Sequence, residues 1–151
     1  MDAERLFQIA GAITMPGWAL LVLLPRWKGS ARLVCGAVIP ALLGVLYVSL
    51  FARYGPGTEG GFGSLADVRQ LFGEPYLLLA GWIHYLAFDL FVGAWEVRDA
   101  QKHGLPHLFV VPCLVLTLML GPTGLLVYLV GRAVKVRSWD LEIAAAELLE
   151  D

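Results

Sequence analysis

Five ionisable side chains lie within one apolar stretch of the sequence, between residues 81 and 99. They are His84, Asp89, Glu96, Arg98 and Asp99. The stretch is long enough to cross a bilayer as a helix, and a charged group at bilayer depth costs a few kcal/mol on insertion scales. Such groups usually face the interior of a helix bundle, where they pair with one another or carry function. A buried carboxyl group is also suited to holding or passing a proton, so the stretch favours acid–base chemistry.

Helical geometry divides these groups into two sets. A helix turns about 100° per residue, so Asp89, Glu96 and His103, spaced seven residues apart, fall on one stripe. Asp99 lies within about 60° of that stripe, whereas His84 is about 140° away from Asp89. We therefore expect His84 to face a different neighbour, or a different wall of one cavity. The candidate catalytic residues are His84, Asp89, Glu96 and Asp99.

Structural roles remain open for the same residues. Asp89 has a few polar residues near membrane depth as alternative hydrogen-bond partners, namely Gln8, Thr14, Ser49, Thr117 and Tyr128. Glu96 and Asp99 together with Arg98 are also typical of a solvated helix end. His84 either serves only as a hydrogen-bonded packing residue within the bundle or takes part in the function.

Large aromatic side chains surround the acids in the sequence. Trp82, Tyr85, Phe88 and Trp95 are the candidate substrate-binding residues. Gly81 and Gly93 leave space beside the helix, so a lipophilic, elongated substrate would fit there. Ordinary packing explains the same aromatic residues, and tryptophan is also frequent at the membrane interface.

Histidine, aspartate and glutamate residues, which can bind metals, are present, but their spacing matches no known metal-site motif. The chain has three histidines, and the spacing matches no Glu-x-x-His pair. The two cysteines, Cys35 and Cys113, lie in apolar runs and are expected to be small buried hydrophobic residues. The sequence therefore predicts no metal and no cofactor.

The composition places the chain in a membrane. Of its 151 residues, 58% are hydrophobic and 16% are charged, and the net charge is −2. A soluble domain usually has about 45–50% apolar and about 25% charged residues. The absence of a basic balance gives no reason to expect a nucleic-acid partner. The first residues, MDAERLFQ, are acidic and do not resemble an organellar transit peptide.

The apolar runs predict an all-α polytopic membrane protein with four spans in one domain over residues 1–131. The expected spans are residues 6–24, 33–51, 75–97 and 107–130, with kinks at Pro16, Pro40 and Gly121-Pro122. Residues 64–72, starting at Ser64, predict a short amphipathic helix on the membrane surface, and 132–151 predict a surface tail. Four spans would place both ends on one side. Five basic residues would then face six, so the orientation rule does not decide between the two sides.

Two motifs resemble those of a known family. The run WIHYLAFDLFVG from Trp82 to Gly93 is followed by Trp95-Glu96 and Asp99-Ala100, and together they resemble the first signature of the neoxanthin-synthase-like family. This family is also called the abscisic-acid-deficient-four-like family. Its second signature is similar to the run from Pro112 to Leu125, in particular the segment GPTGL that begins at Gly121. The resemblance extends from the first span to about residue 131, in the same order of spans.

The resemblance implies carotenoid or isoprenoid chemistry. Plant members are plastid-envelope proteins needed to make neoxanthin from violaxanthin, and this chain, without a transit peptide, resembles the bacterial type in an inner membrane. Opening an epoxide to an allene needs one proton delivered to the oxygen and one removed from a neighbouring carbon, and it needs no redox cofactor. The resemblance makes Asp89 the buried acid, His84 its partner or base, and Glu96 with Asp99 a proton relay to the surface.

Two other functions fit the same residues. One is a lipid- or carotenoid-binding accessory protein that turns nothing over. The other is a small proton-coupled transporter, which would need a homo-oligomer because four helices are few for a transport path. The expected partners are membrane lipid and a hydrophobic isoprenoid ligand.

Overall fold

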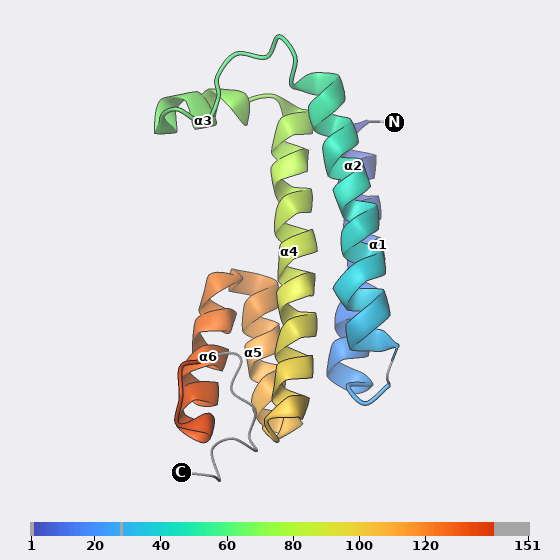
Figure 1. Ribbon diagram of the computed structural model, residues 1–151. Helices are drawn as coiled ribbons and strands as arrows, with labels where there is room; N and C mark the ends of the chain where they lie inside the picture. Colours follow the sequence, from blue (N-terminus) through green and yellow to red (C-terminus); the bar gives the residue numbers. More distant parts are fainter. Residues whose placement is uncertain (1, 28, 141–151) are drawn as a thin grey trace.

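The computed structural model describes residues 2–27 and 29–140, and within them the chain is entirely helical. The elements are α1 (Ala3–Leu23), the π-helical η1 (Ser30–Val38), α2 (Ile39–Tyr54), α3 (Leu65–Leu71), α4 (Pro75–Lys102), α5 (His107–Leu120) and α6 (Pro122–Val136). Figure 1 shows α4 as the central helix, with α1 and α2 on one side and α5 and α6 on the other. The all-α fold class is confirmed.

Three helices are long and apolar enough to cross a membrane. They are Ala3–Leu23, the continuous segment Leu33–Tyr54 formed by η1 and α2, and Pro75–Lys102. The carboxylate of Asp2 caps α1 by accepting a hydrogen bond from the Arg5 backbone N–H at 2.8 Å. The Glu74 carboxylate caps α4 in the same way. These helices associate the chain with a membrane, whereas the kinks expected at Pro16 and Pro40 stay predictions.

The helix expected over residues 64–72 is present as α3. The Ser64 side chain accepts a hydrogen bond from the backbone N–H of Asp67 at 3.1 Å, as the sequence predicts for a cap. In Figure 1, α3 lies across the first-turn end of α4. Its last residues turn the chain back toward α4, since Phe72 packs against Gly81, where a Cβ atom would lie 3.3 Å from the Phe72 ring.

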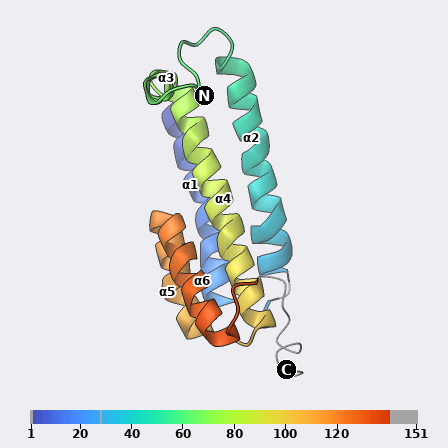
Figure 2. The same ribbon diagram turned by 60° about the vertical axis from the view of Figure 1, so that its left-hand side comes forward.

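The segment expected to form one kinked fourth span folds back on itself instead. The helix α5 ends at Leu120, Gly121 has φ 35° and ψ −92°, and α6 begins at Pro122. Figures 1 and 2 both show α5 and α6 side by side along one half of α4. A helix of 14 residues is about 21 Å long, which is too short to cross a hydrocarbon core of about 30 Å. The two helices form a half-length hairpin whose tip is Gly121.

Two glycines allow the hairpin to close. A Cβ atom at Gly124 would lie 2.1 Å from the backbone nitrogen of Thr117, and one at Gly131 would lie 2.1 Å from the ring of Phe109. Gly124 and Gly131 are seven residues apart, so both lie on the face of α6 that meets α5. Small residues at this spacing let two membrane helices approach closely.

The final helix runs beyond the boundary that the sequence predicts. The helix α6 continues through Gly131 to Val136, and Arg132 within it is buried. Arg132 therefore packs inside the helical domain, although the sequence placed it in a surface tail. The rest of that tail, residues 141–151, lies outside the described residues.

Candidate functional site

One face of α4 carries both the acids and a stripe of cavity-lining residues. Leu78, Trp82 and Tyr85 precede Asp89 by 11, seven and four residues, so they lie within about 40° of it around the helix. Glu96 continues the same stripe. The hairpin covers only the half of α4 that is shown beside α5 and α6 in Figures 1 and 2. Asp89 therefore lies where the covered half of this face meets the half that the hairpin leaves uncovered.

At the covered end, Asp99 is held in a buried cluster. Its Oδ2 atom accepts hydrogen bonds from Arg132 Nε at 2.8 Å and from the Tyr128 hydroxyl at 2.6 Å. The second guanidinium nitrogen of Arg132 lies 3.1 Å from His103 Nε2, and His103 Nδ1 lies 3.2 Å from Asp99 Oδ1. All four side chains are buried. The cluster fastens α6 to the end of α4, which favours a structural role for Asp99.

Glu96 lies one helical level nearer the hairpin tip. Its Oε1 atom accepts a hydrogen bond from the Thr117 hydroxyl at 3.0 Å, which joins α4 to α5. Its Oε2 atom is buried and has no partner within the described part of the chain. Glu96 is fully buried, so the notion of a solvated helix end does not hold for it.

Asp89 lies against the hairpin tip. A Cβ atom at Gly121 would lie 2.9 Å from Asp89 Oδ1, so only glycine fits both this contact and the positive φ. The carboxylate interacts with the side chain of Tyr85. Its Oδ2 atom is buried, and the described residues give it no hydrogen-bond partner. Asp89 thus has unused hydrogen-bonding capacity at the point where the hairpin stops.

Tyr85 connects this acid to a large cavity. Its hydroxyl donates a hydrogen bond to the Leu118 carbonyl at 2.9 Å, which satisfies one of the carbonyls left open at the end of α5. The same ring lines a cavity of about 790 Å³.

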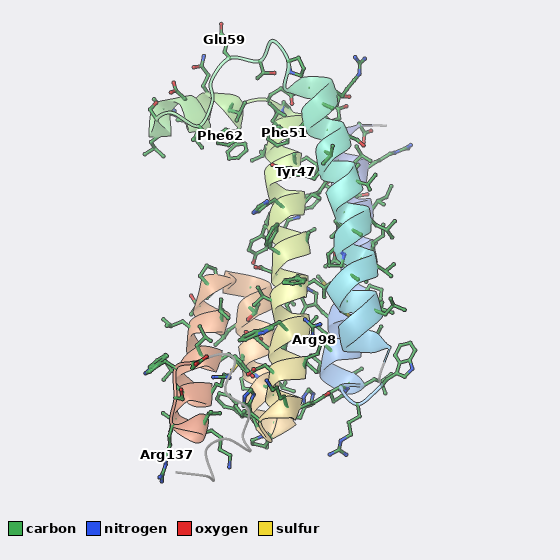
Figure 3. The ribbon with its side chains drawn as sticks, viewed as in Figure 1. Tyr47, Phe51, Glu59, Phe62, Arg98 and Arg137 are labelled. Atoms are coloured by element: carbon green, nitrogen blue, oxygen red, sulfur yellow. The ribbon has the colours of Figure 1, made fainter. Side chains whose placement is uncertain are left out.

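Aromatic side chains from several elements form the walls of that cavity. They come from α1, α2, the loop before α3, the end of α3, and α4; the six that matter most are Phe7, Tyr47, Phe51, Phe62, Phe72 and Trp82. Figure 3 shows Tyr47, Phe51 and Phe62 close to the end of the molecule where α3 crosses α4. A cavity of this size and lining is typical of a site for a hydrophobic ligand.

His84 lies on another side of α4. Its ring stacks on Phe88 with centroids 4.4 Å apart and faces Tyr47 of α2 at 5.9 Å. His84 and Tyr47 line both the large cavity and a second cavity of about 360 Å³ between α2 and α4. No hydrogen bond joins His84 to Asp89 among the described residues. His84 therefore faces α2, as its angular separation from Asp89 predicts, whereas Asp89 faces the hairpin tip and lines neither of these two cavities.

The four predicted substrate-binding aromatics have different surroundings. Trp82 and Tyr85 line the large cavity, and Phe88 lines the second one. Trp95 lines neither of these two cavities and packs edge-on against Tyr128, with ring centroids 5.5 Å apart. Trp95 is therefore a packing residue of the covered half.

The two glycines of α4 have different surroundings. Gly81 lines the large cavity, where the ring of Phe72 lies beside it. At Gly93, a Cβ atom would lie 2.8 Å from the ring of Trp18. Gly93 therefore serves helix packing, whereas Gly81 leaves space at the cavity.

Three polar residues of α5 and α6 bind the acids of α4 in contacts that the sequence does not predict. Arg132 was missed, although Gly124, Tyr128 and Arg132 recur every four residues, a helical spacing that continues past residue 131. Thr117 and Tyr128 were considered as partners of Asp89, and they bind Glu96 and Asp99 instead. No group of three or more histidine, cysteine, aspartate or glutamate side chains within residues 2–27 and 29–140 could hold a metal ion.

Comparisons with known proteins cover the part of the chain that contains these residues. The profile of the ABA DEFICIENT 4-like family matches residues 5–128, which include the acids of α4 and the hairpin tip. The chain is 24% identical over 140 residues to Protein ABA DEFICIENT 4, chloroplastic, of Arabidopsis thaliana. The alignment covers 87% of this chain and 62% of that protein, so the chain spans less than two thirds of its relative's length. No solved structure matches the chain. Since the family profile matches most of the sequence, the chain belongs to the ABA DEFICIENT 4-like family.

Proposed function

We propose that this membrane protein binds a carotenoid or another elongated isoprenoid in the large cavity and isomerises it by acid–base chemistry. The observation that carries the proposal is the aromatic cavity of about 790 Å³ whose wall, through Tyr85, adjoins Asp89. Membership of the family supports a carotenoid-related role, since the family resemblance implies a step from violaxanthin to neoxanthin.

In the proposed reaction, Asp89 delivers a proton to the oxygen of an epoxide and the C–O bond breaks. A second group removes a proton from a neighbouring carbon, so that a hydroxyl group and an allene form with no net oxidation or reduction. Asp89 is suited to the first step because its carboxyl group is buried next to the cavity and has an oxygen without a partner. His84 is the group we assign to the second step, because it lines the same cavity from the α2 side.

Glu96 and Asp99 would extend the proton path away from the cavity. Glu96 follows Asp89 on the stripe at about 10 Å along the helix axis and has one unpartnered oxygen. The ion pair between Asp99 and Arg132 makes Asp99 the fixed end of this path. We therefore assign the movement of the proton to Asp89 and Glu96, and we place Asp99 at the end of the path.

Asp89→Asn tests the proposal directly. We expect the variant to convert an epoxy-carotenoid at least about 100-fold more slowly than the wild type, because an amide cannot donate the proton. The measurement is the absorption spectrum and chromatographic profile of the pigment after incubation with the purified protein in lipid. Asp67→Asn in α3, where the side chain is partly buried and lines neither of the two cavities, is the matched control and should keep full activity. If Asp89→Asn and His84→Ala both convert the pigment at wild-type rates, the mechanism is wrong.

A non-catalytic binding protein is the second candidate. It is favoured by the placement of His84 and Asp89 on different sides of α4, which separates the acid from the base. A pigment that co-purifies with the wild-type protein and stays unchanged would support this candidate. The expected location in a bacterial inner membrane stays a prediction, because the relative's printed location is chloroplastic.

A further inference from the structure

The half-length hairpin changes how often the chain crosses the membrane. The helices α1, η1–α2 and α4 are each long and apolar enough to cross once, whereas α5 and α6 start from the end of α4 and return to the same end. Figure 1 shows the start of α1 at one end of the molecule and the end of α6 at the other. With an odd number of crossings, the two ends of the helical domain lie on opposite sides of the membrane, whereas four spans would place them on the same side.

The basic residues then gather at one end. The connection after α1, the end of α4 and the end of α6 lie at this end, with Arg26, Arg98, Lys102, Lys135 and Arg137. The sequence adds Lys28 in the same connection and Arg32 in the first turn of η1. The opposite end has Arg5, Arg53 and Arg69. Arg132 is left out because it is buried against Asp99. Seven basic residues thus oppose three, where the four-span arrangement gave a draw.

This bias determines the orientation. Lysine and arginine residues close to span ends are retained on the cytoplasmic side during insertion, whereas acidic residues contribute little. We propose that the end with Arg26, Lys102 and Arg137 faces the cytoplasm and that the α3 end faces the opposite side. Figure 3 shows Arg98 and Arg137 in the half of the molecule away from Glu59 and Phe62.

The orientation also assigns the cavity to one leaflet. Phe62 and Phe72, from the loop before α3 and from its end, line the cavity, which therefore lies in the half of the bilayer opposite the cytoplasm. Phe62 and Leu65 are 71% and 86% exposed there, as expected for apolar side chains that enter the lipid. Resting on the proposed function, the inference is that the isoprenoid ligand is taken from this outer leaflet.

Cysteine labelling of the full chain in a bacterial inner membrane tests the orientation. The wild type is the blank, because Cys35 and Cys113 are both buried. Gly61→Cys introduces a thiol at the α3 end, where a Cβ atom meets nothing within 4 Å, and Trp139→Cys introduces one at the other end, where the side chain is 69% exposed. Glu59→Cys gives a second position at the α3 end. We expect a membrane-impermeant maleimide to label Gly61→Cys and Glu59→Cys in intact spheroplasts, and Trp139→Cys only after permeabilisation.

The opposite pattern would overturn the orientation, and labelling of both ends from one side would overturn the three crossings. A charge-shift variant, Arg26→Gln/Lys102→Gln/Lys135→Gln, should raise the labelled fraction of Trp139→Cys in intact spheroplasts several-fold, because it reduces the bias from seven against three to four against three. The matched variant, Arg5→Gln/Arg53→Gln/Arg69→Gln, should leave that fraction unchanged, and an equal effect of both variants would contradict the charge argument. The labelling needs no ligand, so its failure and the failure of the proposed function can be told apart.

Discussion

The three acids on the inner face of α4 differ in how fully their oxygens are bonded. Asp99 binds a guanidinium group, a phenol and an imidazole, whereas Glu96 binds one hydroxyl and keeps one open oxygen. Asp89 has an open oxygen and lies one helical turn beyond Tyr85, which lines the cavity. A carboxylate whose oxygens all have partners is held in place by them, whereas an oxygen without a partner has room to bind a ligand or a proton. The capacity for chemistry therefore increases along α4 toward the cavity.

Arg132→Gln should destabilise the protein strongly. Removing one member of a buried ion pair leaves the other charge without compensation, which usually costs about 3–5 kcal/mol. The measurement is the free energy of unfolding in detergent, followed by tryptophan fluorescence. Lys135→Gln, an exposed change in the same helix, is the control and should alter that free energy by less than about 0.5 kcal/mol. A loss below about 1 kcal/mol for Arg132→Gln would show that the cluster is not buried as described.

The hairpin is the element on which the candidate acid depends, because its tip at Gly121 packs against Asp89. Its geometry satisfies backbone groups that lipid cannot bond. Pro122 starts α6 without an N–H group, and Tyr85 donates to the Leu118 carbonyl at the end of α5. A re-entrant element of this kind is stable only while it packs against protein, and here α4 provides that surface.

Gly124→Ala should separate α5 from α6. The added Cβ would meet backbone atoms of Thr117 at 2.1 Å, which side-chain movement cannot relieve, so we expect a loss of about 1–3 kcal/mol or more. Gly11→Ala is the matched control, because a Cβ atom there meets nothing within 4 Å and alanine favours the helix. Thermal unfolding of both variants in the same detergent measures the difference. Equal melting temperatures would contradict the close approach at Gly124.

Local patterns predicted most of the helices. Apolar runs of span length predict α1, α2 and α4, and Ser64 with the stripe that follows it predicts α3. The hairpin was missed because a Gly-Pro pair inside an apolar run is compatible with a kink as well as with a reversal. Whether the chain kinks or reverses depends on Gly124 and Gly131, which allow α6 to pack closely against α5. This packing is a tertiary contact, which the local sequence pattern does not contain.

At the scale of the whole molecule, the cavity requires four elements at once. Residues of α1, α2, α4 and the α3 region line it, so helical periodicity within α4 alone could not reveal its position. That periodicity did predict that Asp89, Glu96 and His103 share a face, since helix geometry fixes it. It also predicted that His84 faces elsewhere. The partners Thr117, Tyr128 and Arg132 could not be assigned, because they reach these residues only through the hairpin.

Leu78→Trp should block the cavity without unfolding the protein. Leu78 lines the cavity and is 57% exposed, so a larger ring can occupy the open space without displacing the core. We expect the affinity for an epoxy-carotenoid, titrated by absorbance in detergent, to fall about tenfold, which corresponds to about 1.4 kcal/mol. Leu42→Trp is the matched control, since Leu42 is equally exposed and lines neither of the two cavities. Equal losses in both variants would show that the ligand binds elsewhere.

The ion pair between Asp99 and Arg132 also has a consequence for biogenesis. The hairpin follows α4 in the chain, and its second helix carries an arginine that would be costly to release alone into lipid, at about 2.5–3.5 kcal/mol on insertion scales. The Asp99 partner is already present in α4 when the hairpin leaves the ribosome, so the two can enter the bilayer as one neutralised unit. Membrane insertion of the hairpin is thereby coupled to its tertiary contact with α4, and a chain that ends before Arg132 leaves Asp99 without its guanidinium partner.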